Sequence, residues 1–378
     1  MKKILSLAAA AFLASTNITL AQEESTPPAS GSKGTLDLTG YVDTYYQYNL
    51  NRPASGLNTG RIFDLNHNQF NLGLIQTMFT YSKDRVTVVA DLTFGPNADL
   101  GNFGNEGTAR FIKQAFIAYD LSDKFTFTIG QFGTHIGYEL IDAPLNYNYS
   151  LSYLFGNGPF YHTGAKLDYT ASDRFGLMLG VVNGWDGLQD FNDKKSIAAQ
   201  VHVSPIEGID VFANWIGGDE YNTLSAFGDH SGSYTSLFDL TTTYEISEAV
   251  KIGFNGAYGS FRTGASEVSA DDPWSRDATW KGGALYLNFN TSETFGFGVR
   301  GEYFSDPSGV RYFGPVDVKA LTLTGDIKLA NGKFNIKPEL RHDVARDNFF
   351  EDNLGRGKKN QTTVGAAFIY SFNAAILK

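Results

Sequence analysis

The residues best suited to acid–base chemistry or metal binding are six histidines. They are His67, His135, His162, His202, His230 and His342. Gln200, His202 and Ser204 alternate along one segment, which would place a base and a nucleophile on one face of a strand. A hydrolytic triad depends on geometry, and no local sequence signature marks one here. The histidines are therefore interpreted as polar side chains of a wall or of loops, and an enzyme is not predicted.

Carboxylates are concentrated near the ends of long polar segments. They are Asp210, Asp219, Glu220, Asp229, Asp271 and Asp272. Their spacing is not that of a calcium-binding loop. They are interpreted as solvated groups or as carboxylates that bridge lipopolysaccharide, and neither a metal site nor a cofactor is predicted.

The N-terminus has the features of a secretory signal peptide. Residues 1–3 are basic, residues 4–13 are apolar, and small residues at 19–21 precede a cleavage site. The apolar run is too short for a hydrocarbon core that requires about 20 residues. We expect residues 1–21 to be removed and residues 22–34 to form a flexible periplasmic leader. Removal of the signal leaves 28 of the 30 basic residues against 40 acidic ones, a net charge of −12, so nucleic acid is not expected as a partner.

Composition favours a membrane barrel over a helical membrane protein. Mean hydropathy is negative, and after the signal no apolar run approaches the length of a transmembrane helix. A spanning strand needs only about 9 to 11 residues with one apolar face. The chain has 14% aromatic residues, 41 glycines and no cysteine, so neither disulfides nor a lipoprotein anchor is predicted. A secreted β-sandwich or propeller is the soluble alternative.

Short and long polar connections alternate along the chain from Thr35 to Phe372. The short connections are residues 82–85, 121–124, 171–174, 204–208, 247–249, 290–294 and 330–333. The long connections are residues 51–68, 95–109, 133–160, 183–195, 217–233, 262–278, 305–317 and 346–358. Outer-membrane barrels have short periplasmic turns, long extracellular loops and an even number of strands. The pattern predicts an all-β, transmembrane, up-and-down antiparallel β-barrel of about sixteen strands.

Several predicted strands have one apolar and one charged face. In residues 334–343, Phe334, Ile336 and Leu340 alternate with charged residues, and residues 295–304 and 318–329 show the same period of two. The charged faces predict pore-lining residues Arg300, Glu302, Asp326, Lys328, Lys337, Glu339, Arg341 and Asp343. Aromatic residues flank the short turns, as expected for a periplasmic girdle: Tyr81, Tyr119, Tyr169, Phe289, Phe125, Phe175, Phe295 and Phe334.

Two predicted strands lack a clean alternation. Residues 69–81 carry apolar side chains on both faces, so the face that meets lipid stays open. In residues 110–119, Lys113 shares a face with Phe111, Ala115 and Ile117. We expect Lys113 to extend its ammonium group to the outer lipid headgroups.

The last predicted strand, residues 362–372, has Val364, Phe368, Tyr370 and Phe372 on one face. It resembles the aromatic C-terminal strand that outer-membrane proteins present to the barrel-assembly machinery. In that pattern the aromatic residue usually comes last, whereas six residues follow Phe372 here. We expect a barrel domain at residues 35–372 and a C-terminal extension at residues 373–378.

Short motifs in the middle of the chain resemble the β-barrel porin family called OmpL-like. They are Ile-Gly-Gln-Phe at 129–132, Gly-Tyr-Glu at 137–139, Tyr-Ser at 149–150, Gly-Pro-Phe-Tyr-His-Thr-Gly at 158–164 and Val-Asn-Gly-Trp-Asp at 182–186. The resemblance covers essentially the whole mature chain and implies a porin of the bacterial outer membrane. Gly-Gln-Phe is also similar to phosphate-selective porins, but the mixed charges of the predicted lumen do not support phosphate selectivity.

Sixteen strands enclose a channel rather than a packed interior, so we expect passive diffusion of small polar solutes and ions. By analogy with general porins, the longest connection, residues 133–160, would fold into the lumen and place Tyr138, Glu139 and Asp142 at a constriction. An external lid is the alternative position. Expected partners are outer-membrane lipid and lipopolysaccharide, the barrel-assembly machinery and solutes, and a homo-oligomer stays open.

Two alternatives to a passive porin stay open. One is a ligand-selective channel, for example for carbohydrates, in which the loop aromatics Tyr147, Tyr149, Tyr153 and Trp185 would bind the ligand. The other is a barrel with an adhesive or enzymatic role.

Overall fold

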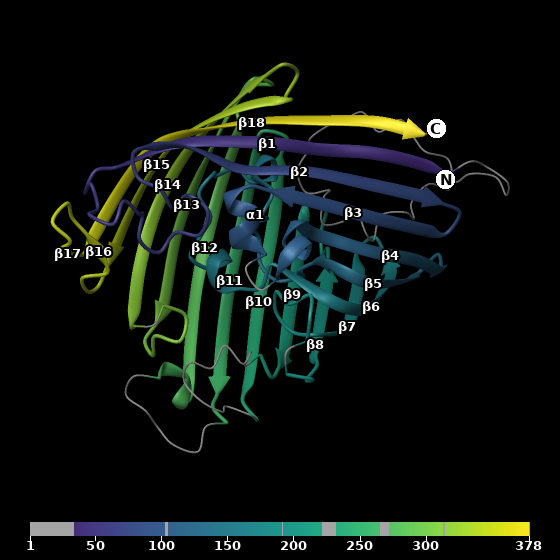
Figure 1. Cartoon of the computed structure of the whole chain (residues 1–378). Helices are drawn as coiled ribbons and strands as arrows, with labels where there is room; N and C mark the ends of the chain where they lie inside the picture. The colour runs from purple at the N-terminus through teal and green to yellow at the C-terminus, as the bar shows by residue number, and fades with distance from the viewer. Residues whose placement is uncertain are drawn as a thin grey trace.

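Sixteen antiparallel strands close into one barrel, in which the last strand pairs with the first (Figure 1). The computed structural model describes residues 34–102, 105–190, 192–220, 232–264, 272–312 and 314–377. The predicted signal peptide and residues 22–33 of the leader lie outside the described residues. Closure pairs the edge groups that lipid cannot satisfy, and the predicted barrel with about sixteen strands is confirmed.

The strand bounds follow the predicted alternation of turns and loops. The barrel strands are β1 (Thr35–Asn49), β2 (Gln69–Lys83), β3 (Val86–Phe94), β4 (Ile112–Ser122), β5 (Phe125–Gly133), β6 (Tyr161–Ser172), β7 (Phe175–Val182), β8 (Ser196–Val203), β9 (Ile209–Gly218), β10 (Tyr234–Ser247), β11 (Val250–Arg262), β12 (Ala278–Asn290), β13 (Phe295–Asp306), β14 (Val316–Leu329), β15 (Phe334–Ala345) and β18 (Asn360–Leu377). The long loops contain a helix, α1 (Pro96–Gly101), a small hairpin of β16 (Phe350–Glu351) and β17 (Gly357–Lys358), and short 3₁₀ turns. Within the described part of the chain, no helix is long and apolar enough to cross a membrane.

The last strand is longer than the sequence predicts. Asn373 pairs with Thr39, and Leu377 pairs with Leu36. Residues 373–377, predicted as a C-terminal extension, therefore continue β18 as part of the barrel wall. The correction has a simple cause, because the first residues of β1 would otherwise have an unpaired edge.

A β-bulge in β2 explains why that strand has no consistent apolar face. Val42 and Thr44 of β1 pair with Ile75 and Leu72, so three residues of β2 span two of β1. The extra residue reverses the alternation. Leu72 is exposed on the outside, whereas Leu74 is 2% exposed and points inward.

A second irregularity places Lys113 inside the barrel. Asp91 and Leu92 of β3 pair with Gln114 and Ile112, which leaves Lys113 as the bulged residue of β4. Its side chain is buried, and its ammonium lies 3.3 Å from the Asp91 carboxylate. The expectation that Lys113 reaches the outer headgroups is therefore wrong, because the bulge reverses the face on which it lies.

The orientation of the barrel makes a test possible in intact cells. We expect added trypsin to cleave after Arg356, in the last long loop, and to spare Arg85 and Arg174 in the short turns. The short turns lie at the periplasmic end, which the protease cannot reach. Permeabilised cells serve as the control, since the Arg85 side chain is 52% exposed and should then be cut. Cleavage after Arg85 in intact cells would reverse the orientation.

Candidate functional site

The connection between β5 and β6, residues 134–160, lies inside the barrel. We call it the lumen loop. Its Tyr149, Ser150 and Tyr153 are buried against inward-facing side chains of the strands. Of the two positions that the sequence left open, the structure has the loop in the lumen rather than outside as a lid.

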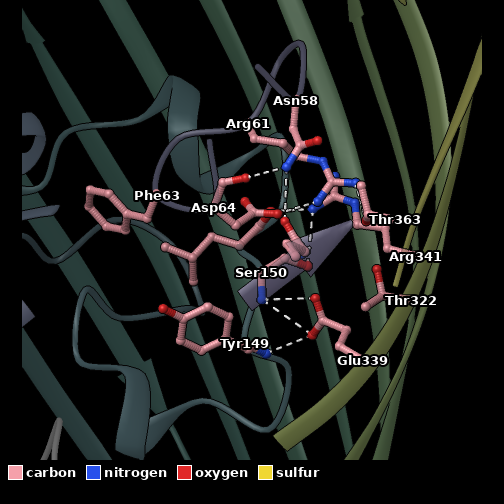
Figure 2. A network of polar contacts seen from close by, with 12 residues as sticks. Asn58, Arg61, Phe63, Asp64, Tyr149, Ser150, Thr322, Glu339, Arg341 and Thr363 are labelled. Carbon is pink, nitrogen blue, oxygen red and sulfur yellow. Dashed lines mark hydrogen bonds and ion pairs between the residues drawn. The ribbon is translucent and has the colours of Figure 1, made fainter. Parts of the chain in front are cut away.

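Charged side chains of the wall bind the main chain of the lumen loop directly. Figure 2 shows the amide nitrogens of Tyr149 and Ser150 facing the Glu339 carboxylate, at 2.8 and 3.1 Å. The Glu302 carboxylate accepts a hydrogen bond from the amide of Tyr153 at 2.7 Å. Ionised acceptors and donors make stronger hydrogen bonds than neutral ones, so this irregular segment is fixed without a β-ladder.

Basic side chains of the wall bind the loop carbonyls in the same way. The guanidinium of Arg341 donates to the carbonyl of Leu151 at 2.7 Å, and that of Arg300 donates to the carbonyl of Ser150. The Lys337 ammonium donates to the carbonyl of Ala143 at 3.1 Å. Both the donors and the acceptors of the loop backbone are thus held by ionised groups of β13 and β15.

Charged side chains of β13, β15 and two long loops form a continuous chain of alternating charges, which we call the anchor network. Its members, in order of contact, are Glu139, Arg300, Glu302, Arg341, Asp343, Arg61 and Asp64. The pairs include Arg300 to Glu139 at 2.5 Å, Arg341 to Asp343 at 2.9 Å and Arg61 to Asp343 at 2.6 Å. The side chains of Arg61, Arg300 and Arg341 are all 0% exposed. The network therefore joins the first long loop, the lumen loop and the wall.

The three predicted constriction residues all contact the wall. Glu139 pairs with Arg300, and Asp142 binds the Lys113 ammonium at 2.5 Å. The ring of Tyr138 stacks on Tyr286 of β12 with centroids 4.2 Å apart. A cavity of about 20 Å³, room for about one water molecule, lies between this part of the loop and β10–β12. The lumen loop thus packs closely against the wall there.

The eight predicted pore-lining residues are divided between two environments. Arg300, Glu302, Lys337, Glu339, Arg341 and Asp343 point inward but are buried against the lumen loop. Asp326 and Lys328 lie nearer the short turns, and their side chains are 11% and 26% exposed. Their role as channel lining stays a prediction.

Other inward-facing charges are more open. Asp210 and Glu245 are 41% and 40% exposed at their side chains, and Lys166 and Asp168 are 21% and 18% exposed. They lie on β6, β9 and β10, toward the short turns. From the sequence, Asp210 is interpreted as a solvated or lipopolysaccharide-bridging group, and Lys166, Asp168 and Glu245 are not predicted as lumen residues. Lys166 and Asp168 alternate with outward Leu167, the same period of two that identified β15.

The group containing His202, Ser204 and Asp210 is not arranged as a catalytic triad. The Nε2 atom of His202 lies 2.8 Å from Asp210 and 3.2 Å from Ser204, so one nitrogen faces both partners. Ser204 also donates to Asp210. In a triad the acid binds the nitrogen opposite the nucleophile. The three side chains therefore do not have the order of a Ser–His–Asp triad.

The loop after β7 is held at the mouth of the barrel by two half-buried carboxyls. Asp186 accepts a hydrogen bond from the amide of Phe160 at 2.5 Å, and Glu220 accepts one from the amide of Trp185 at 2.7 Å. Burial raises the pKa of Asp186 and that of Glu220 to about 7. The folded loop therefore favours their protonated forms, and the stability that they contribute falls as the pH rises from their ordinary pKa values of 3.8 and 4.5 to about 7.

Comparison with known proteins identifies both the fold and the family. The family described as "Putative beta-barrel porin-2, OmpL-like" matches residues 35–372. The comparison with curated proteins gives no significant match.

Solved outer-membrane proteins share the architecture at low sequence identity. The anion-selective porin of Comamonas acidovorans has a TM-score of 0.60 at 11% identity over 90% of this chain and 100% of its own. OmpT of Vibrio cholerae has a TM-score of 0.58 at 12% identity over 91% of this chain and 99% of its own. The channel DcaP of Acinetobacter baumannii has a TM-score of 0.56 at 12% identity over 92% of this chain and 100% of its own.

The family match covers all sixteen barrel strands except residues 373–377 of β18, and the similar structures have the same fold. The chain is a channel-forming protein of the bacterial outer membrane. It belongs to the OmpL-like β-barrel porin family.

Proposed function

We propose that this porin conducts small polar solutes and ions past the lumen loop, along the inner face of β6–β11. The observation that carries the proposal is the contrast in exposure. The anchor arginines are 0% exposed, whereas the inward side chains of Asp210 and Glu245 are about 40% exposed. These exposed polar groups lie toward the short turns, whereas nearer the mouth the lumen loop contacts β8–β10 as well as β13 and β15.

The inward charges at the short-turn end of the lumen, where this path leaves the barrel, favour cations. Lys166 pairs with Asp168 at 2.8 Å, Lys251 pairs with Glu245 at 3.0 Å, and Lys328 lies 3.8 Å from Asp326. The inward carboxylate of Asp120 accepts a hydrogen bond from Thr126, whereas that of Asp210 binds His202 and lies within range of the Lys251 charge. Among these inward groups, five carboxylates (Asp120, Asp168, Asp210, Glu245 and Asp326) face three lysines (Lys166, Lys251 and Lys328), so the potential in the open part of the lumen is negative.

Single-channel recording tests the conduction and its selectivity together. We expect Asp210→Asn to lower the cation-to-anion permeability ratio by roughly two- to threefold, because a charge about 6 Å from an ion changes its energy by about 0.7 kcal/mol in water. The ratio comes from the reversal potential of refolded protein in a salt gradient. Asp173→Asn, in a short turn, is the matched control and should leave the ratio unchanged. A refolded barrel that conducts no ions would contradict the channel, whereas an unchanged ratio would contradict only the path.

The carbohydrate alternative is not favoured by the positions of the loop aromatics. The Tyr149 hydroxyl donates to Asp43 at 2.7 Å, and that of Tyr153 donates to Asp343 at 3.2 Å. Trp185 lies against the Arg311 guanidinium. These rings are engaged within the protein and are not free to stack on a sugar.

We also infer that the last strand presents the chain to the barrel-assembly machinery, on the basis of its exposed outward side chains Val364, Phe368 and Tyr370. We also propose that lipid and lipopolysaccharide surround the barrel and that the protein forms a homo-oligomer.

A further inference from the structure

Three basic side chains project from the outside of the barrel near its extracellular rim. Lys281 of β12 lies on the same strand face as Leu285, which is 48% exposed. Lys319 of β14 lies on the same strand face as Leu321, which is 59% exposed. Arg346, directly after β15, follows outward-facing Val344 by two residues. All three side chains are exposed. We call Lys281, Lys319 and Arg346 the rim patch.

The three residues lie at nearly the same height on consecutive strands. Lys281 pairs with Ser305 of β13, and Lys319 pairs with Tyr303, two residues away on the same strand. The amide of Arg346 donates to the carbonyl of Asp317 at 2.9 Å. Because neighbouring strands are about 4.8 Å apart, β12 and β14 are separated by about 10 Å. Side chains as long as lysine and arginine can therefore converge on one headgroup. Figure 1 shows β12 to β15 side by side in the wall.

These cations have no carboxylate partner within the described part of the chain. Asp317 lies on the same outer surface, but its carboxylate accepts a hydrogen bond from the Tyr303 hydroxyl at 2.9 Å. Exposed Tyr258 and half-buried Tyr303 flank the lysines. Tyrosines of this kind mark the depth of the lipid headgroups. The patch thus offers three cations against one carboxylate at the level where phosphate groups lie.

The rim on the other side of the barrel has a different character. There the outward side chains at the loop ends of β2 and β3 and just before β4 are Phe70, Phe94 and Phe111, exposed by 87%, 38% and 43%. Phe94 and Phe111 pack together with ring centroids 5.1 Å apart. The phenylalanines of that rim can pack against lipid acyl chains, whereas the cations at the rim of β12–β15 can bind anions. The basic side chains are therefore a local feature and not a general property of the rim.

We propose that Lys281, Lys319 and Arg346 form a binding site for the phosphate groups of an outer-leaflet lipid headgroup. Lysine and arginine form charge-assisted hydrogen bonds with phosphate oxygens. Anionic lipid is the partner that the outside of a spanning barrel meets at this depth. The site lies outside the lumen, so it goes beyond conduction and does not depend on it.

Native mass spectrometry of the detergent-refolded full barrel tests the site. The probe is lipid A with two phosphates, compared with the same lipid after enzymatic removal of the phosphates. We expect the wild-type protein to retain the phosphorylated lipid. The variant Lys281→Gln/Lys319→Gln/Arg346→Gln should retain at least about tenfold less of the phosphorylated lipid than the wild type, because three charged contacts are lost.

The matched control is Lys83→Gln/Lys124→Gln/Lys333→Gln, which removes three exposed lysines from the short turns. It should bind the phosphorylated lipid as the wild type does. Heat-modifiable migration in gels verifies that both variants are folded, and single-channel conductance should be unchanged in both. The site is refuted by equal lipid retention in the rim variant and the wild type, by equal binding of the dephosphorylated lipid, or by a wild type that binds neither lipid.

Discussion

Arg300→Met is expected to lower the free energy of unfolding by about 3 to 5 kcal/mol and to enlarge the single-channel conductance. Removing one partner of a buried ion pair leaves the other charge without compensation. Here both Glu139 and Glu302 lose their pairing with Arg300. The carbonyl of Ser150 also loses its guanidinium donor. Because the same contacts hold the lumen loop, the loss of stability and the widening of the lumen should appear together.

Urea unfolding and planar-bilayer recording of refolded protein measure the two effects of Arg300→Met. Arg262→Met is the matched control, since Arg262 is exposed at the loop end of β11 and makes no ion pair within the described ranges. It should change neither quantity. A destabilised variant with wild-type conductance would show that the loop stays in the lumen without the anchor network. Wild-type stability would show that the network contributes little.

Leu340→Arg should lower the free energy of unfolding by about 2 to 4 kcal/mol. This is the range for arginine at a lipid-facing site near the bilayer midplane. Leu340 is 47% exposed on the outside of β15 and pairs with Leu323 and Val364, which are outward as well. A guanidinium there would face hydrocarbon. Refolding into vesicles, followed by denaturant titration, measures the loss.

The control for Leu340→Arg makes the same substitution outside the membrane. Leu354 is 68% exposed in the loop between β15 and β18, so Leu354→Arg should leave stability nearly unchanged. Equal effects of the two variants would show that the outer face of β15 does not meet lipid.

The strands could be predicted from the sequence because their pattern is local. A barrel strand alternates between lipid and lumen, so Leu340 and Arg341 identify their own faces without knowledge of any partner. Two strands, β2 and β4, do not follow this alternation, and the amino-acid composition does not reveal the local cause. The bulges at Leu74 and Lys113 each insert one residue, which reverses the alternation and is not marked by any residue type.

The anchor network could not be predicted, because its partners are far apart in the sequence. Arg61 reaches Asp343, which is 282 residues away, and it lies in a loop without periodicity. From the sequence, Arg341 is expected to face open water, so that Arg341→Glu would change ion preference with little effect on stability. The structure reverses that expectation. Arg341 is buried between Glu302 and Asp343, and a carboxylate in its place would face two like charges.

The anchor network also constrains the order in which the protein can fold. Glu139 belongs to the first half of the chain, whereas Arg300 and Arg341 come from β13 and β15. The lumen loop therefore has no charged partners on β13–β15 until those late strands are in place. Contacts of such long sequence separation form late, because the intervening chain must first be ordered. Docking of the loop is thus among the last steps of folding, and the interior stays hydrated until the wall around it is nearly complete.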